Sequence, residues 1–163
     1  MENKVTFRNA ERKDTGLILQ FVKELAAYED MSDDVIADES ILETWIFDKQ
    51  KAEVLFAVVD GTEVGFALFF HNFSTFLGRA GLYLEDLFVM PEYRGKGLAR
   101  RLVENVIEQE RKAGKKALRL DVIENNTTAE RLYQKLGFRY IQTKTLYYDV
   151  VGEMTFKLYE LVL

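Results

Sequence analysis

A strand that passes into a helix across two closely spaced glycines constrains this chain more than any other feature of its sequence. The segment reads Val89-Met90-Pro91-Glu92-Tyr93-Arg94-Gly95-Lys96-Gly97-Leu98-Ala99. Glycine permits a tight turn and a close approach of the backbone to a bound group, and the first amides of a helix have no acceptor within the helix. Such a turn is typical of a phosphate-binding site.

Two common phosphate-binding motifs do not fit this segment. A Walker A loop requires Ser or Thr after Gly-Lys, whereas Gly97 follows Lys96. A dinucleotide fingerprint requires a third small residue at the position that Arg100 occupies. An ordinary glycine turn that caps a helix stays open as an alternative to phosphate binding.

Hydrophobic periodicity predicts the remaining elements. We expect helices at residues 14–29, 38–47, 98–113 and 127–136, and strands near residues 5–7 and at 54–59, 63–73, 81–90, 117–122, 138–148 and 154–161. Asp14 and Asp38 are predicted helix caps, and Asp60-Gly61 predicts a tight hairpin. A strand, a helix and a following strand make a crossover, which predicts that the fourth and fifth long strands are parallel in an otherwise antiparallel sheet. The length of 163 residues predicts a single domain over residues 1–163.

Arg94-Gly95-Lys96-Gly97-Leu98-Ala99 resembles the coenzyme A loop of the GNAT superfamily, in which Arg or Gln is followed by two residues, Gly, one residue and Gly or Ala. The resemblance continues in residues 84–89 and 125–138. Within this superfamily, the chain resembles the diamine (spermidine/spermine) acetyltransferases most in residues 23–29, 64–67 and 83–86. The resemblance implies an α/β (α+β) fold with a mixed, mostly antiparallel sheet, helices on both faces and a splay between strands 4 and 5.

The resemblance implies that acetyl-CoA is the cofactor and that coenzyme A is released as a product. The pyrophosphate is expected on the loop and the pantetheine arm on the preceding strand and on the start of the last helix. The residues expected to bind the cofactor are Leu87, Phe88, Val89, Arg94, Gly95, Lys96, Gly97, Leu98, Ala99, Asn126 and Tyr133. For Asn126, a plain helix cap is nearly as good an interpretation, and both can hold together.

Two residues are candidates for proton transfer. The resemblance assigns Tyr133 as the acid that protonates the departing thiolate, against the alternative of a helix tyrosine packed on the sheet. It assigns Glu85 as the base, acting through water. Glu29, Glu85 and Asp86 are the candidates for holding the substrate's ammonium groups, because they are acidic. Adjacent strand residues point to opposite faces, so Glu85 and Asp86 reach one cleft only if a bulge intervenes. Solvated strand-end charges are the alternative.

Composition excludes several other kinds of site. The chain has no cysteine and one histidine, His71, so we expect no metal site. The net charge of −5 disfavours nucleic acid and suits a cationic small molecule. No apolar run predicts a signal peptide or a membrane span, and we expect a cytoplasmic protein. The resemblance also implies a homodimer.

The resemblance implies an N-acetyltransferase that moves the acetyl group to a primary amine of a polyamine or diamine by direct attack in a ternary complex. Lysine analogues such as thialysine, or other amino acids, are the alternative substrates. A non-catalytic acyl-CoA sensor is the alternative from another class of protein, although a sensor needs neither Tyr133 nor Glu85.

Overall fold

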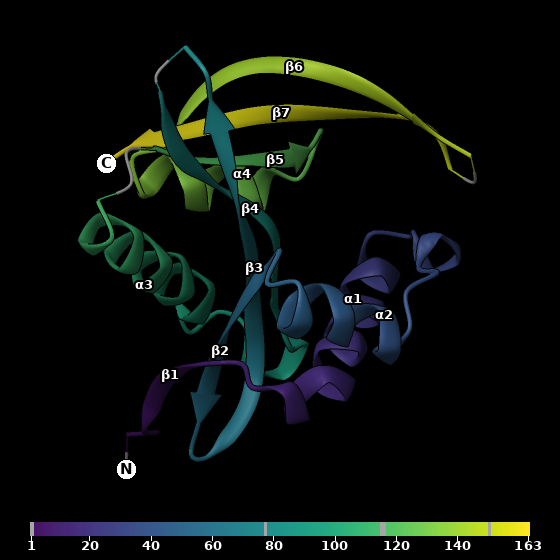
Figure 1. Ribbon diagram of the computed structural model, residues 1–163, viewed down its shortest axis with the longest axis vertical. Helices are drawn as coiled ribbons and strands as arrows, with labels where there is room; N and C mark the ends of the chain where they lie inside the picture. Colours follow the sequence, from purple (N-terminus) through teal and green to yellow (C-terminus); the bar gives the residue numbers. More distant parts are fainter. Residues whose placement is uncertain (1, 77, 115–116, 150) are drawn as a thin grey trace.

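The computed structural model describes residues 2–76, 78–114, 117–149 and 151–163. These residues form a seven-stranded sheet with helices on both faces (Figure 1). The strands are β1 (Val5–Asn9), β2 (Glu53–Val59), β3 (Thr62–Ser74), β4 (Arg79–Val89), β5 (Ala117–Ile123), β6 (Arg139–Tyr148) and β7 (Gly152–Val162). The α-helices are α1 (Thr15–Tyr28), α2 (Glu39–Glu43), α3 (Leu98–Lys112) and α4 (Thr127–Lys135). Shorter helical turns are η1 (Arg12–Asp14), η2 (Ser32–Asp34), η3 (Thr44–Asp48) and η4 (Pro91–Tyr93).

The sheet has the order β1-β2-β3-β4-β5-β7-β6. Its neighbouring strands are antiparallel except β4 and β5, which are parallel and are connected through α3. The predicted mixed sheet with one parallel pair is therefore confirmed. Asp60 and Gly61 have φ values of 49° and 85°, as the predicted two-residue hairpin requires.

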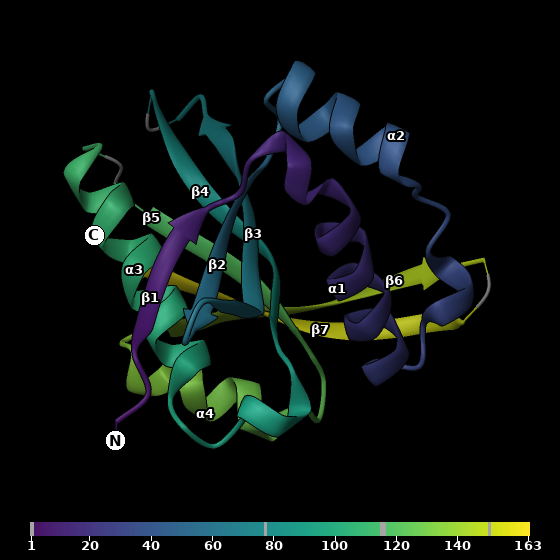
Figure 2. The same cartoon turned by 90° about the horizontal axis from the view of Figure 1, so that it is seen from below.

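Two apolar cores lie on opposite faces of the sheet, and Figure 2 shows α1 and α2 on one side and α3 on the other. Strand β2 separates them by simple alternation. Leu55, Ala57 and Val59 face the core that α3 and α4 share, whereas Val54, Phe56 and Val58 face α1 and η3. Apolar side chains on both faces of this strand thus allow helices to pack on both of its faces.

Cap predictions were right at one helix and wrong at another. Asp38 caps α2, since its Oδ1 accepts a 2.8 Å hydrogen bond from the Ile41 amide. Asp14 precedes α1 but does not cap it with its side chain. Its carboxylate instead accepts hydrogen bonds from the Arg8 guanidinium at 2.8 and 2.9 Å and from the Glu11 amide at 2.7 Å. A charged partner from β1 outcompetes the helix amides, a contact that local sequence does not reveal.

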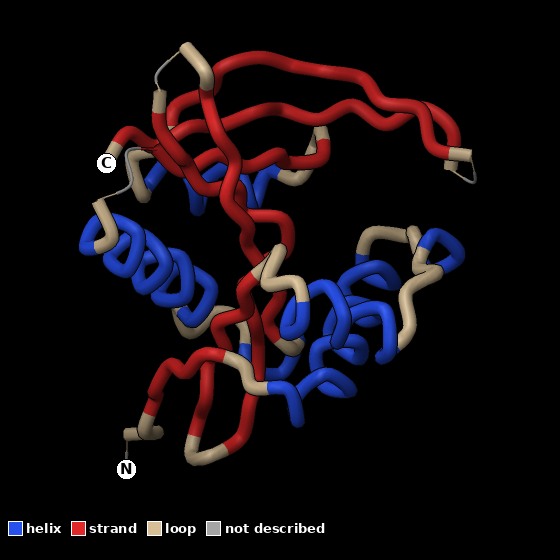
Figure 3. The backbone as a smooth tube through the Cα atoms, in the orientation of Figure 1, coloured by secondary structure: helices blue, strands red, loops and turns tan. Residues whose placement is uncertain are grey.

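The hairpin of β6 and β7 reaches across the molecule toward the segment that follows α1 (Figures 1 and 3). It joins the sheet through the antiparallel pairing of β7 with β5. This hairpin and the end of α1 enclose the region where β4 and β5 separate. Within the described ranges, no helix combines the length and apolar character that crossing a membrane requires.

Candidate functional site

Strands β4 and β5 pair only over a short stretch and then separate. Their parallel register comprises Leu82–Leu84 against Leu118–Leu120. Past the last pair, β4 continues to Val89 and β5 to Ile123. A cleft of about 590 Å³ opens there, lined by both strands, the glycine loop, α4, the end of α1 and the β6–β7 hairpin. The separation leaves backbone groups of both strands beside the cleft, and it confirms the predicted splay.

A β-bulge in β4 lies at the point where the two strands separate. Leu68 of β3 pairs with Asp86 and Phe69 pairs with Leu84, so Glu85 is the extra residue on β4. Before the bulge Leu82 and Leu84 face the α3/α4 core, whereas after it Leu87 and Val89 do. The bulge shifts the alternation by one residue. Glu85 and Asp86 consequently both line the cleft, which regular alternation would forbid.

The glycine loop has the backbone geometry that its sequence predicts. Gly95 and Gly97 both have a φ of 74°, and a Cβ built on either would meet no atom within 4 Å. The open space that each glycine leaves lies at the N-terminus of the long helix α3, where free amides favour an anion. Arg94 Nε donates a 2.8 Å hydrogen bond to the Val89 carbonyl, which anchors the loop to the end of β4. These features fit the pyrophosphate of coenzyme A.

Most of the predicted cofactor-binding residues line the cleft. Those that do are Leu87, Val89, Arg94, Gly95, Gly97, Leu98, Ala99, Asn126 and Tyr133. Phe88 does not, because its ring lies in the α1 core with its centroid 5.6 Å from that of Phe21. Lys96 is not part of the lining either, although its ammonium lies 5.4 Å from the centroid of the Tyr93 ring, which is. The cofactor-binding roles of Phe88 and Lys96 stay predictions.

Helix α4 and its N-cap bring Tyr133 and Asn126 to the cleft. Asn126 caps the helix, since its Oδ1 accepts a 3.2 Å hydrogen bond from the Ala129 amide. Tyr133 is buried, and its ring centroid lies 5.5 Å from that of Phe138. Burial, with a smaller contribution from Glu29, raises the pKa of Tyr133 well above its ordinary value. The phenol is therefore protonated at neutral pH, while its packing also makes it part of the α3/α4 core.

Carboxylates gather in the cleft beside Tyr133. Burial raises the pKa of Asp86 to about 7, and the charges of Glu85 and Glu29 add to the rise. Burial likewise raises the pKa of Glu85. Burial also raises the pKa of Glu29, and the charge of Glu85 adds to that rise. Like charges held together and partly removed from water disfavour ionisation. A bound cation would relieve both effects.

Sequence reasoning missed another carboxylate, Asp121, at the position in β5 that follows the last pair with β4. Its Oδ2 accepts hydrogen bonds from the Tyr83 hydroxyl and, at 2.6 Å, from Lys144 Nζ of β6. Asp121 and Tyr83 both line the cleft. The one signal for Asp121 in the sequence was its charge inside the otherwise apolar run Leu120-Asp121-Val122.

The rest of the lining was also unforeseen. Part of it adjoins the predicted residues of the loop and of α4, and part comes from α1 and the segment after it, from β5 and from the β6–β7 hairpin. These residues are Leu25, Tyr28, Met31, Tyr93, Arg100, Val122, Ile123, Thr128, Ala129, Leu132, Leu146, Tyr148 and Phe156. They close the cleft with apolar and aromatic surface around the charged groups. Tertiary contacts bring the end of α1 and the β6–β7 hairpin together.

The chain resembles known acetyltransferases in sequence and structure. The model of the acetyltransferase (GNAT) family matches residues 19–138. A thialysine N-epsilon-acetyltransferase of Bos taurus is 38% identical over 142 residues, which cover 82% of this chain and 83% of that protein. A probable spermine N(1)-acetyltransferase of Bacillus subtilis subsp. natto is 32% identical over 84 residues, or 50% of this chain and 55% of the relative.

A solved structure shares the fold. It is a putative acetyltransferase from Salmonella typhimurium with its cofactor acetyl-CoA, and it superposes with a TM-score of 0.81 and 23% sequence identity. The superposition covers 98% of this chain and 94% of that chain.

Asp86 should reduce the stability of the folded protein at alkaline pH. Its pKa is about 7 when folded against 3.8 for the free side chain, so the folded state retains a proton that the unfolded state loses. Stability from this group is therefore greatest at low pH and falls as the pH rises from about 4 to 7. We expect Asp86→Asn to raise the free energy of unfolding by about 2 kcal/mol at pH 8 and by little at pH 4.

Urea denaturation of wild type and variant at the two pH values measures this difference. Asp48→Asn is the control, because Asp48 is half-exposed in a surface ion pair with Arg12 and should change stability by less than about 1 kcal/mol. An Asp86→Asn variant that is less stable than wild type at pH 8 would contradict the prediction.

Proposed function

Because the chain belongs to the acetyltransferase (GNAT) family, we propose that it transfers the acetyl group of acetyl-CoA to a primary amine of a small cationic substrate. A polyamine or diamine is the first substrate class. The observation that carries this proposal is the grouping of Glu29, Glu85, Asp86 and Asp121 in one cleft with Tyr133. Clustered carboxylates attract a molecule with several ammonium groups.

Acetyl-CoA, the cofactor of this family, supplies an acetyl group activated as a thioester. Three parts of the chain fit it: the open amides around Gly95 and Gly97, the strand Leu87–Val89 beside the separation, and Asn126 at the start of α4. The loop would hold the pyrophosphate and β4 the pantetheine arm. This arrangement directs the thioester end toward the bulge in β4.

Proton transfer is the chemistry that the side chains perform in this proposal. An alkylammonium has a pKa of about 10 in water, so it must lose a proton before its nitrogen can attack. Glu85 accepts this proton through water, while Asp86 and Glu29 hold the cation. Asp86 is the alternative base, because its pKa of about 7 is well matched to neutral pH. The Tyr133 hydroxyl donates a proton to the departing sulfur. The nitrogen loses its second proton when the amide forms, and this proton returns to the Tyr133 oxygen through water, so that one proton is released overall to Glu85.

Tyr133→Phe tests the enzymatic proposal. Removal of a general acid should lower kcat about 100-fold or more, with acetyl-CoA binding retained, because the ring remains to fill its place in the core. Coenzyme A release is measured with spermidine, spermine, putrescine, lysine, thialysine and a neutral peptide. Tyr140→Phe is the matched control, since the exposed Tyr140 bonds only Thr143 in the described contacts.

Two outcomes would count against the proposal in different ways. A Tyr133→Phe variant with the kcat of wild type would remove the acid role alone. Binding of acetyl-CoA without turnover of any amine would favour the alternative of an acyl-CoA sensor.

Lysine analogues are the second candidate substrates, and Lys144 is the observation that favours them. Its ammonium lies 2.6 Å from Asp121 Oδ2 at the cleft wall and is about one-third exposed. A diamine has no group that benefits from a cation there. An amino acid has one, because its α-carboxylate pairs with Lys144 while its α-ammonium pairs with the cleft carboxylates. The resemblance to a thialysine N-epsilon-acetyltransferase supports the same class.

Lys144→Met distinguishes the two candidates when lysine is compared with cadaverine, its decarboxylated form. If the substrate is an amino acid, kcat/KM for lysine should fall about tenfold while that for cadaverine stays level or rises. Lys157→Met is the matched control, because Lys157 forms an ion pair with Glu130 at 3.0 Å and follows the cleft residue Phe156 on β7. An equal fall in kcat/KM for lysine and for cadaverine would contradict the amino-acid candidate.

We propose, finally, that the protein is a homodimer that associates through β6. This strand lies at the edge of the sheet. It exposes Tyr140, Ile141, Leu146 and Tyr147 by 42–75%. An apolar strand edge is a template for pairing with another chain. Light scattering should give a mass near twice that of one chain, and Tyr147→Arg together with Ile141→Lys should halve it. A single-chain mass for wild type at all concentrations would refute the dimer.

A further inference from the structure

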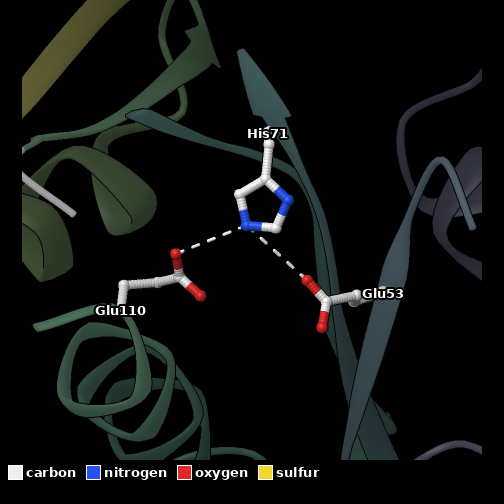
Figure 4. A group of neighbouring side chains, drawn as sticks. All are labelled: Glu53, His71 and Glu110. Atoms are coloured by element: carbon white, nitrogen blue, oxygen red, sulfur yellow. Dashed lines mark ion pairs between the residues drawn. The ribbon is translucent and has the colours of Figure 1, made fainter. Parts of the chain in front are cut away.

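Three side chains from separate elements converge outside the acetyl-transfer cleft. Glu53 begins β2, His71 lies on β3 and Glu110 lies on the last turns of α3. Figure 4 shows the His71 imidazole pointing between the two carboxylates. These three residues do not line the cleft, so their arrangement is not explained by acetyl transfer.

Two of the distances within this cluster are close to the spacing of ligands on one metal ion. His71 Nε2 lies 3.5 Å from Glu110 Oε2 and 3.7 Å from Glu53 Oε2. Hydrogen bonds of this type are shorter, at about 2.7–3.2 Å. Two ligand atoms bound at about 2.0–2.2 Å with a tetrahedral angle lie about 3.3–3.6 Å apart. One ligand atom of each residue lies within 4.8 Å of the other two, so small side-chain movements complete the geometry.

The donor atoms select a class of metal. An imidazole nitrogen with two carboxylate oxygens is a common ligand set for Zn²⁺ and related divalent transition metals, whereas Mg²⁺ and Ca²⁺ favour oxygen ligands throughout. Carboxylate oxygens contribute negative charge to the cluster, and this charge attracts a divalent cation.

The three side chains of the cluster differ in burial, so one is held in place and two can adjust. The Glu110 side chain is 6% exposed, on the helix that packs Val103, Val106 and Ile107 into the core. His71 and Glu53 are 40% and 59% exposed, so an ion has access from solvent, and water can complete its coordination. A bound ion would connect α3 directly to β2 and β3.

We propose that Glu53, His71 and Glu110 bind one divalent transition-metal ion, with Zn²⁺ preferred, as a structural clamp between α3 and the sheet. A lone histidine without cysteine gave no spacing pattern from which to expect this site. The ligands are far apart in sequence, and only the pairing of β2 with β3 and the packing of α3 assemble them.

The test uses the full chain without a histidine tag, treated with chelator and then titrated with ZnCl₂ in a calorimeter. We expect one ion per chain and a rise in Tm of roughly 5–10 °C at a hundredfold excess over Kd. Co²⁺ in place of Zn²⁺ should give the visible absorption of a tetrahedral site. Mg²⁺ at the same concentration should leave Tm unchanged.

Variants decide whether these residues bind the ion. His71→Gln and Glu53→Gln change exposed positions and should weaken binding at least tenfold, even if Glu110→Gln fails to fold. Glu104→Gln is the matched control, because Glu104 lies on the same helix in a surface pair with Arg100 and should bind as wild type does. Absence of zinc binding by wild type, or an unchanged Kd in His71→Gln, would overturn the proposal.

Discussion

Strands β4 and β5 share three residue pairs and then separate. The candidate site depends on this separation. Parallel strands that stayed paired would satisfy each other's backbone groups and leave no opening. Here the crossover through α3 starts at the end of β4, and the glycine loop lies at the mouth of the gap. One interruption of the sheet thus provides free backbone groups, a space of about 590 Å³ and a helix N-terminus facing it.

The bulge at Glu85 makes this cleft acidic. Without the extra residue, β4 would direct Asp86 and Phe88 to the face that Leu84 occupies and Leu87 and Val89 to the other. The observed shift instead buries Phe88 with α1 and leaves both carboxylates at the cleft. The raised pKa of Asp86 is the energetic cost of that placement. The folded protein loses stability at this site, and a bound substrate ammonium would restore it. Such a local loss of stability is common at functional sites.

Local signals predicted much of this structure. The Asp60-Gly61 hairpin, the Asn126 cap and the glycine loop depend on backbone preferences within a few residues, and each is present. The order of strands and helices predicted the parallel pair, because few crossover topologies are allowed. The roles of Tyr133 and Glu85 came from the resemblance to a family, and they remain predictions.

Features that depend on distant contacts were not predictable in this way. The contact of Lys144 with Asp121 requires the pairing of β6, β7 and β5 in the correct order. The expected cap at Asp14 failed because Arg8 from β1 binds its carboxylate. In each case, the contacts of a side chain are decided by tertiary structure and not by its local sequence.

A crystal structure of the protein with coenzyme A and thialysine would test most directly whether the separation of β4 and β5 is the acetyl-transfer site. We predict the pyrophosphate on the amides of residues 95–99, the pantetheine arm along residues 87–89 and the sulfur within hydrogen-bond reach of the Tyr133 hydroxyl. The amine of the substrate should lie beside Glu85 and Asp86. Coenzyme A bound outside the gap, or a sulfur that points away from both Tyr133 and the carboxylates, would contradict this assignment.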